Sequence, residues 1–267
     1  MHMEKIHFEK PNFKELKKKY LLVDMHSHTA ASHDCNTPIK DFGTKIKELG
    51  IGVSITDHNS IKGALAYKRI FPKQFILPGI EVTTSEDKDI LLYFHSFSDF
   101  IDFHVREISP KIKSHRTNAF VSKTTITNEE LLDIAKDYNA FRVLPHPLQM
   151  MKGIYKSLLK KKDFSILKKV EAIEVLNSTM SLKANLTALA WAHIERMPMT
   201  GGSDSHILKT LGGTVTAARA ETVDEFLEKI RKKQNKVYGT PNRWRDDMKS
   251  LVTIAKNKLK KSKRNLS

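Results

Sequence analysis

Short apolar segments that run directly into histidines or acidic residues recur along this chain of 267 residues. The first, residues 20–25, leads into His26 and His28. The second, residues 52–56, leads into His58. Because a compact apolar run rich in β-formers is typical of a buried strand, polar side chains are expected at the carboxyl end of one strand after another.

Helical patterns separate these segments. After the first segment, Thr37 and Pro38 predict a helix start and Gly50 predicts its end. Further strands are predicted at residues 75–82, 89–94, 141–144, 172–176, 199–201 and 213–216, and further helices at residues 128–138, 181–195 and 222–234. The strand at 89–94 is expected to pair with its neighbour. The alternation predicts an α/β fold whose parallel sheet closes into a barrel, with the chemistry on the face where the strands end.

One barrel domain is expected over residues 20–242, because a single α/β barrel routinely reaches this length. Residues 1–19 are expected to form a polar arm, and residues 243–267 a basic helical tail. Cys35 is the only cysteine, which excludes an intramolecular disulfide and thiolate zinc sites. No apolar stretch approaches the roughly 20 residues that span a bilayer. A soluble, cytoplasmic protein that does not bind membranes is therefore expected.

The formal net charge of +16 favours attraction to polyanions, but it specifies no chemistry. Much of the charge is local, since residues 243–267 contain nine Lys or Arg and only two Asp. Nucleic acid is thus a candidate partner for the basic surface and tail. The oligomeric state stays open.

The pair His26 and His28 is the first candidate metal site. Residues two apart in a strand point the same way, so both imidazoles can reach one ion. Buried imidazoles and carboxylates are costly unless they are paired or bind a cation. The other candidates that follow predicted strand ends are Asp34, His58, Glu81, His146, Asp204 and His206. Their joint occurrence predicts a metal cluster.

Five motifs in this order resemble the PHP (polymerase and histidinol phosphatase) family of metallophosphoesterases. They are Asp24-Met25-His26-Ser27-His28-Thr29, Thr56-Asp57-His58-Asn59, Pro78-Gly79-Ile80-Glu81, Leu144-Pro145-His146-Pro147 and Gly202-Ser203-Asp204-Ser205-His206. The resemblance covers about residues 20–220. It implies a distorted, TIM-like (β/α)7 barrel with two or three divalent ions of zinc, manganese or iron at the C-terminal ends of the strands.

Ligand roles follow from the resemblance. It implies one ion held by His26, His28, Glu81 and Asp204, a second held by Asp34, His58 and His206, and a further ion that includes His146. Glu81 is expected to bridge two ions. Pro145 and Pro147 are expected to fix the backbone of His146.

Two ligand positions have alternatives. In the first motif Asp34 is preferred and His33 is the competitor. The second position concerns the predicted strand at residues 89–94. Many relatives have a histidine that leads into this strand, where this chain has Asp89. Other relatives have a histidine at the far end of the strand, where this chain has His95. His95 is taken as the predicted ligand, with Asp89 as its competitor.

The implied mechanism is hydrolysis by a metal-activated water, which needs no Ser, Cys or Thr nucleophile. His58 and His206 are the predicted catalytic residues, together with Asp57, which is expected to orient His58 or a loop amide. A lid over residues 105–125 is predicted to bind the substrate phosphate.

The lid residues assigned to the substrate are Lys113 and Arg116. Glu174 lies in a predicted strand, where a contact with the site and a structural hydrogen bond are equally expected.

The predicted function is hydrolysis of a phosphomonoester, either a nucleotide or another small phosphorylated metabolite. An exonuclease-type phosphodiesterase that acts on short RNA or DNA ends is the first alternative. A catalytically degenerate nucleic-acid-binding module is the second alternative, and the near-complete ligand set argues against it.

Overall fold

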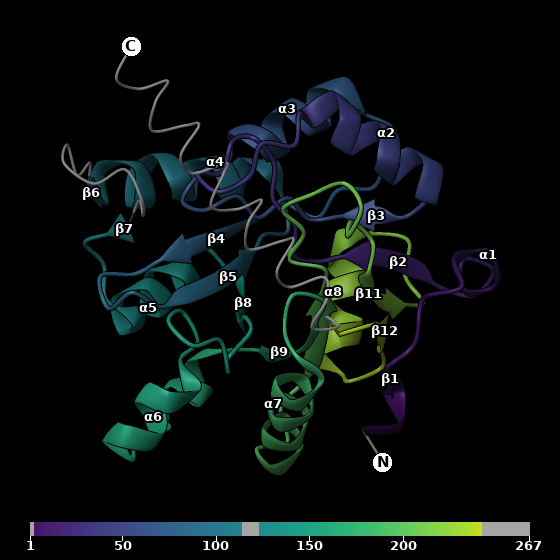
Figure 1. The fold of residues 1–267 in the computed structure, drawn as a ribbon. Coiled ribbons are helices and arrows are strands. Elements are labelled where there is room, and N and C mark those ends of the chain that lie inside the picture. Colours follow the sequence, from purple (N-terminus) through teal and green to yellow (C-terminus); the bar gives the residue numbers. More distant parts are fainter. Residues whose placement is uncertain (1–2, 114–122, 242–267) are drawn as a thin grey trace.

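Two five-stranded sheets form the centre of the protein (Figure 1). The computed structural model describes residues 3–113 and 123–241. In spatial order, the first sheet contains β1 (Ile6–His7), β12 (Lys236–Gly239), β11 (Thr214–Ala218), β2 (Leu21–Asp24) and β3 (Gly52–Val53). The second contains β10 (Met199–Gly202), β9 (Ala172–Asn177), β8 (Phe141–Leu144), β5 (Asp89–Tyr93) and β4 (Gly79–Thr83). The short strands β6 (Ile112–Lys113) and β7 (Lys123–Thr124) pair separately.

Helices surround the sheets, with α2 and α3 at the top of Figure 1 and α7 at the bottom. The α-helices are α1 (Phe13–Leu16), α2 (Ile39–Leu49), α3 (Lys62–Ile70), α4 (Phe97–Phe103), α5 (Asn128–Asp137), α6 (Tyr155–Lys161), α7 (Leu182–Ile194) and α8 (Val223–Arg231). Short 3-10 helices cover Met3–Lys5, Ser109–Lys111 and Ser165–Lys169, and a π-helix covers His104–Ile108. No helix in the described ranges is long and apolar enough to cross a membrane. The expected cytoplasmic location stays a prediction.

Local sequence explains several helix boundaries. Gly50 ends α2 with a left-handed φ of 62°, a conformation that glycine adopts without steric cost. Thr127 and Glu130 form a reciprocal capping box at the start of α5. Ser181 and Thr222 cap α7 and α8 through their side chains. The helices predicted at these places are confirmed.

The predicted closed barrel of parallel strands is not observed, although the α/β class is confirmed. Both sheets are mixed, since β4 and β5 pair antiparallel and β2 and β11 do the same. The loop between β4 and β5 is too short for the crossover that parallel strands require. Isolated bridges join Val53 to Ile76 and His58 to Glu81, so the two sheets approach each other there without forming one continuous ladder.

Part of the predicted N-terminal arm belongs to the first sheet. Ile6 and His7 pair in parallel with Val237 and Tyr238. The rings of His7 and Tyr238 stack with centroids 4.3 Å apart. Residues 6–7 therefore form an edge strand.

An apolar core fills the space enclosed by the two sheets. It contains Val23 and Met25 from the first sheet region and Leu91 and Tyr93 from the second. Helix α8 contributes its own apolar face, made by Phe226, Leu227 and Ile230. The α8 helix thus packs against this core from the end opposite to the carboxyl end of β2.

The carboxyl ends of β2 and β10 are joined by backbone hydrogen bonds. The Asp204 N–H donates to the His26 carbonyl at 2.7 Å, and the His28 N–H donates to the Ser205 carbonyl at 3.0 Å. A Cβ atom on Gly202 would lie 2.4 Å from the His26 Cβ, so only glycine permits this close approach. The first and last sequence motifs are therefore held side by side by the main chain.

We expect Tyr93→Phe to destabilise the protein, because the Tyr93 hydroxyl donates to the buried Met25 carbonyl at 2.7 Å. A buried carbonyl left without its partner costs roughly 1–3 kcal/mol, and urea unfolding should show a loss of about that size. Tyr67→Phe is the matched control, since the buried Tyr67 hydroxyl has no hydrogen-bond partner among the described residues. It should leave the free energy of unfolding unchanged or raise it. Equal losses in both variants would contradict this account.

Candidate metal centre

Imidazoles and carboxylates converge where β2, β3, β8 and β10 end. In the described part of the chain they form four groups, and within each group the candidate ligand atoms lie within 4.8 Å of one another. The groups are His28, Asp34, His58 and His206; His26, Glu81 and His146; His26, His28 and Asp204; and His58, Glu81 and Asp89. Eight of the nine ligands predicted from the sequence are thus brought together. His95 is the exception.

Glu81 lies at the centre of the cluster. It occupies the middle of β4 and is 1% exposed. Its Oε2 lies 3.2 Å from His26 Nε2 and 3.4 Å from His58 Nδ1, and its Oε1 lies 3.0 Å from His146 Nε2. His28 Nε2 also lies 3.4 Å from Oε2. One carboxylate therefore faces four imidazoles, which is the geometry that a bridging ligand requires.

The outer edge of the cluster is formed by Asp34, His58 and His206. Asp34 Oδ2 lies 3.1 Å from His206 Nε2 and 3.5 Å from His58 Nε2. Side-chain exposure is 10–12% for these three residues, against 0% for His26 and His28. The side of Asp34, His58 and His206 is therefore the side of the cluster that is more open to solvent.

Asp204 connects the outer and inner residues. Its Oδ1 lies 3.2 Å from His28 Nε2 and 3.5 Å from His26 Nε2. The backbone of Asp204 has a φ of +50°, and that of His146 has a φ of +25°. Such values are unfavourable for residues other than glycine and occur at sites where the surrounding structure enforces them.

The structure favours Asp34 over His33. Asp34 belongs to the group with His28 and His58, whereas His33 is in none of the groups and places its ring 5.0 Å from that of His58. Ser32 donates a hydrogen bond of 2.7 Å to Asp34 Oδ1 and so fixes the carboxylate.

The structure also places Asp89, and not His95, in the cluster. Asp89 belongs to the group with His58 and Glu81. The His95 ring contacts Asp224 on α8 instead. Because β5 runs antiparallel to β4, the start of β5 lies at the metal centre and its far end lies near α8.

Asp57 is buried beside the cluster but is in none of the four groups. It accepts hydrogen bonds from the Thr29 N–H at 2.6 Å and the Thr29 hydroxyl at 2.7 Å. A Cβ on Gly63 would lie 2.0 Å from Asp57 Oδ2, so α3 packs closely on this carboxylate. Asp57 therefore holds the loop after His28, which agrees with the expected contact to a loop amide.

Glu174 is a residue whose role the sequence left open. Its Oε1 lies 3.1 Å from His26 Nδ1, and its Oε2 accepts from the His146 N–H at 2.8 Å. With a proton on Nδ1, His26 presents Nε2 to Glu81 and Asp204, as a metal ligand requires. Glu174 thus orients two candidate ligands and is itself in none of the four groups.

The charge of the cluster fits a bound cation. Burial lowers the pKa of His58, but the carboxylates of Glu81 and Asp34 raise it to about 10. Burial likewise lowers the pKa of His206, and Asp34 raises it to about 9. The carboxylates therefore require positive charge beside them, and a divalent ion supplies it in place of protons.

His28 is suited to be a ligand for a different reason. Burial and the neighbouring His206 lower its pKa to about 4, which keeps the imidazole neutral. Neither ring nitrogen of His28 forms a hydrogen bond within the described residues. Neutral imidazoles and carboxylates together are the donor set of divalent transition ions.

The predicted substrate lid is only partly described. Arg116 lies outside the described residues, and Lys113 is described only as part of the backbone of β6. Two other cations of this segment, Arg106 and Lys111, pair with acids one helical turn away. The basic tail at 243–267 also lies outside the described residues.

Comparisons with known proteins agree with this site. The family model PHP_C, described as PHP-associated, matches residues 183–235. A probable phosphatase of Shewanella loihica is 27% identical over 233 residues, covering 78% of this chain and 88% of the relative.

Two solved structures share the fold. A two-domain protein from Bacteroides vulgatus, which contains a predicted PHP-like metal-dependent phosphoesterase, has a TM-score of 0.60 at 16% identity, over 88% of this chain and 68% of its own. The lesion-specific endonuclease EndoQ from Pyrococcus furiosus has a TM-score of 0.58 at 18% identity, over 82% of this chain and 57% of its own.

The ligand cluster and its place in the fold define a metal-dependent hydrolase of the α/β class. The match to a PHP-associated family model and the likeness to a probable phosphatase support the PHP-domain family that the five motifs indicated.

We expect His26→Ala, His58→Ala and Asp204→Ala each to lower the metal retained after dialysis by roughly one ion per chain or more, because each removes a ligand. Elemental analysis of the purified variants measures this directly. His193→Ala on the exposed side of α7 is the control and should retain full metal content. Unchanged metal in all three site variants would rule out the assignment.

Proposed function

We propose that the chain hydrolyses a phosphomonoester, either a nucleotide or another small phosphorylated metabolite. The observation that carries this proposal is the sharing of ligands among the four groups: His26, His28, His58 and Glu81 each belong to two of them. This arrangement suits two or three divalent ions a few ångströms apart, of zinc, manganese or iron. The curated relative named a probable phosphatase supports the same chemistry.

When bound, such ions supply a water of lowered pKa and neutralise charge on the phosphoryl oxygens. The chain's own residues shape the site around them. His58 and His206 face the open side, so they border the position of the phosphate. His206 Nδ1 lies 2.9 Å from the Asp204 carbonyl, and donation to this oxygen leaves Nε2 for the metal side. Asp57 acts as a positioning residue through Thr29.

Lys152 is the cation that we assign to the substrate phosphate. Its Nζ is buried and has no hydrogen-bond partner among the described residues. It lies 3.9 Å from Asp89 Oδ1, next to the group that includes Glu81. A buried ammonium without hydrogen bonds is costly, and a phosphoryl oxygen at this edge of the cluster would satisfy it.

A phosphodiesterase that acts on the ends of short RNA or DNA is the second candidate. The fold likeness to EndoQ and the formal net charge of +16 favour it. A degenerate binding module is opposed by the ligand set, because such a module has no need to keep eight metal-binding side chains together.

We expect Lys152→Ala to lower kcat/KM for a phosphomonoester by roughly 10- to 100-fold, mainly through KM, because a binding contact to the phosphate is lost. Lys156→Ala is the control, since Lys156 is exposed four residues further along. Steady-state kinetics on metal-loaded protein measures both. A Lys152 variant with unaltered KM would refute the assignment.

The function itself is tested by assaying metal-loaded protein against phosphomonoesters, nucleotides, bisphosphorylated nucleotides and labelled oligonucleotides. We expect turnover of a phosphomonoester that is lost on chelation and in Asp204→Ala. Turnover of oligonucleotides alone, falling steeply with salt, would replace the first candidate with the second. No turnover of any substrate by protein with full metal content would contradict both.

A further inference from the structure

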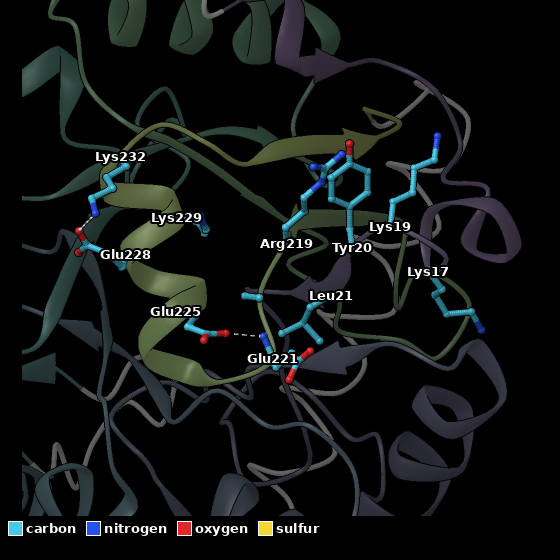
Figure 2. A pocket seen from close by; sticks show the side chains of 11 residues that line it. Lys17, Lys19, Tyr20, Leu21, Arg219, Glu221, Glu225, Glu228, Lys229 and Lys232 are labelled. Atoms are coloured by element: carbon cyan, nitrogen blue, oxygen red, sulfur yellow. Dashed lines mark hydrogen bonds and ion pairs between the residues drawn. The ribbon is translucent and has the colours of Figure 1, made fainter.

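Two adjoining hollows lie at the opposite end of the first sheet from the metal centre. The larger, of about 970 Å³, is lined by the start of β2, the residues after β11 and one side of α8 (Figure 2). The smaller, of about 320 Å³, adds Lys5, Gln234 and Lys236. Tyr20, Arg219 and Lys229 line both hollows, so the two form one continuous site.

Basic side chains dominate this site. Those without a carboxylate within 4.0 Å in the described ranges are Lys5, Lys17, Lys19, Arg219, Lys229 and Lys236. The smaller hollow has four of them and no acidic residue. Like charges held together without counterions repel one another, so the site favours an anionic ligand.

The acidic residues are confined to the larger hollow. Glu228 pairs with Arg231 and Lys232, and Glu225 accepts a hydrogen bond from the Glu221 N–H at 2.8 Å. Figure 2 shows the Glu228–Lys232 and Glu225–Glu221 contacts beside α8, away from Tyr20 and Arg219. The negative part of a ligand therefore belongs in the smaller hollow, and a polar, uncharged part fits the larger one.

Tyr20 supplies an aromatic surface between the two hollows. Its ring is half-buried, and Lys236 Nζ lies 5.9 Å from the ring centroid. Figure 2 shows the Arg219 side chain beside the Tyr20 ring. An aromatic ring flanked by cations is the combination that binds a nucleic-acid base together with its phosphate.

We propose that these hollows bind a nucleotide unit, with its phosphate in the smaller hollow and its base against Tyr20. A free nucleotide and a single-stranded nucleic acid share this chemistry. A membrane surface fits poorly, because none of the large exposed apolar residues in the described ranges lines the site. An acidic peptide would pair with the cations, but its carboxylate side chains would not stack on the Tyr20 ring.

The site is independent of the metal centre. Tyr20 precedes His26 by six residues along β2, a separation of up to about 20 Å at roughly 3.3 Å per residue. The residues that line the two hollows include none of the candidate metal ligands. A test of nucleotide binding in the hollows therefore does not depend on whether the proposed function is correct.

The test is a fluorescence-anisotropy titration of the full chain with a labelled single-stranded phosphorothioate oligonucleotide of about 12 nucleotides. Arg219→Ala/Lys236→Ala removes two cations of the smaller hollow, and it should weaken binding at least about tenfold and reduce the slope of log affinity against log salt by about 1. The matched control is Lys18→Ala/Arg231→Ala, which removes the same charge from residues that pair with Glu15 and Glu228. It should bind like the parent chain.

Tyr20→Leu should weaken binding about tenfold and Tyr20→Phe should not, because only the first removes the ring. Thermal unfolding confirms that each variant folds, and turnover at the metal centre should be unchanged in all of them. Competition by AMP at similar concentration identifies a free nucleotide as the ligand, and its failure identifies a strand.

Two results would overturn the proposal. One is an equal loss of affinity in the hollow and control double variants, which would reflect net charge alone. The other is undiminished binding by Tyr20→Leu together with full displacement by inorganic polyphosphate, which would show a general polyanion surface.

Discussion

The concentration of buried negative charge at one end of the sheets is the constraint on which the rest of the site depends. All seven buried carboxylates in the described part of the chain belong to the metal centre or contact it. Burying so many carboxylates is unfavourable unless cations lie among them. The four groups of candidate ligands share members in a closed ring, so a change in one group also affects two others.

The gathering of eight candidate ligands could be predicted because their positions follow from simple rules. Alternation in β2 places His26 and His28 on one side, and the ends of successive strands supply the remaining residues. His95 was preferred over Asp89 because of the resemblance to relatives, and it lies outside the cluster. The antiparallel direction of β5 carries His95 to Asp224 and leaves Asp89 at the cluster. Strand direction is a tertiary property that a β–α alternation does not specify.

The prediction of a closed parallel barrel was wrong because strand direction was also assumed there. Strand β11 runs antiparallel to β2 and interrupts the expected parallel order. The sequence did contain a signal for the role of Glu174, because Glu174 is the one charged residue of the otherwise largely apolar strand β9. A charge in such a strand must be paired, but its partners His26 and His146 are distant in sequence. The basic hollows could not be predicted from the sequence. Tyr20 and Arg219 are brought together only by the pairing of β2 with β11.

The main-chain bonds between residues 26–28 and 204–205 have a consequence for how the protein matures. They join segments about 180 residues apart, so a growing chain carries both histidines long before it contains Asp204. Contacts between such distant segments form late and slowly in folding. The two ligand groups that contain Asp204 or His206 are therefore completed only after the last motif has been synthesised and docked.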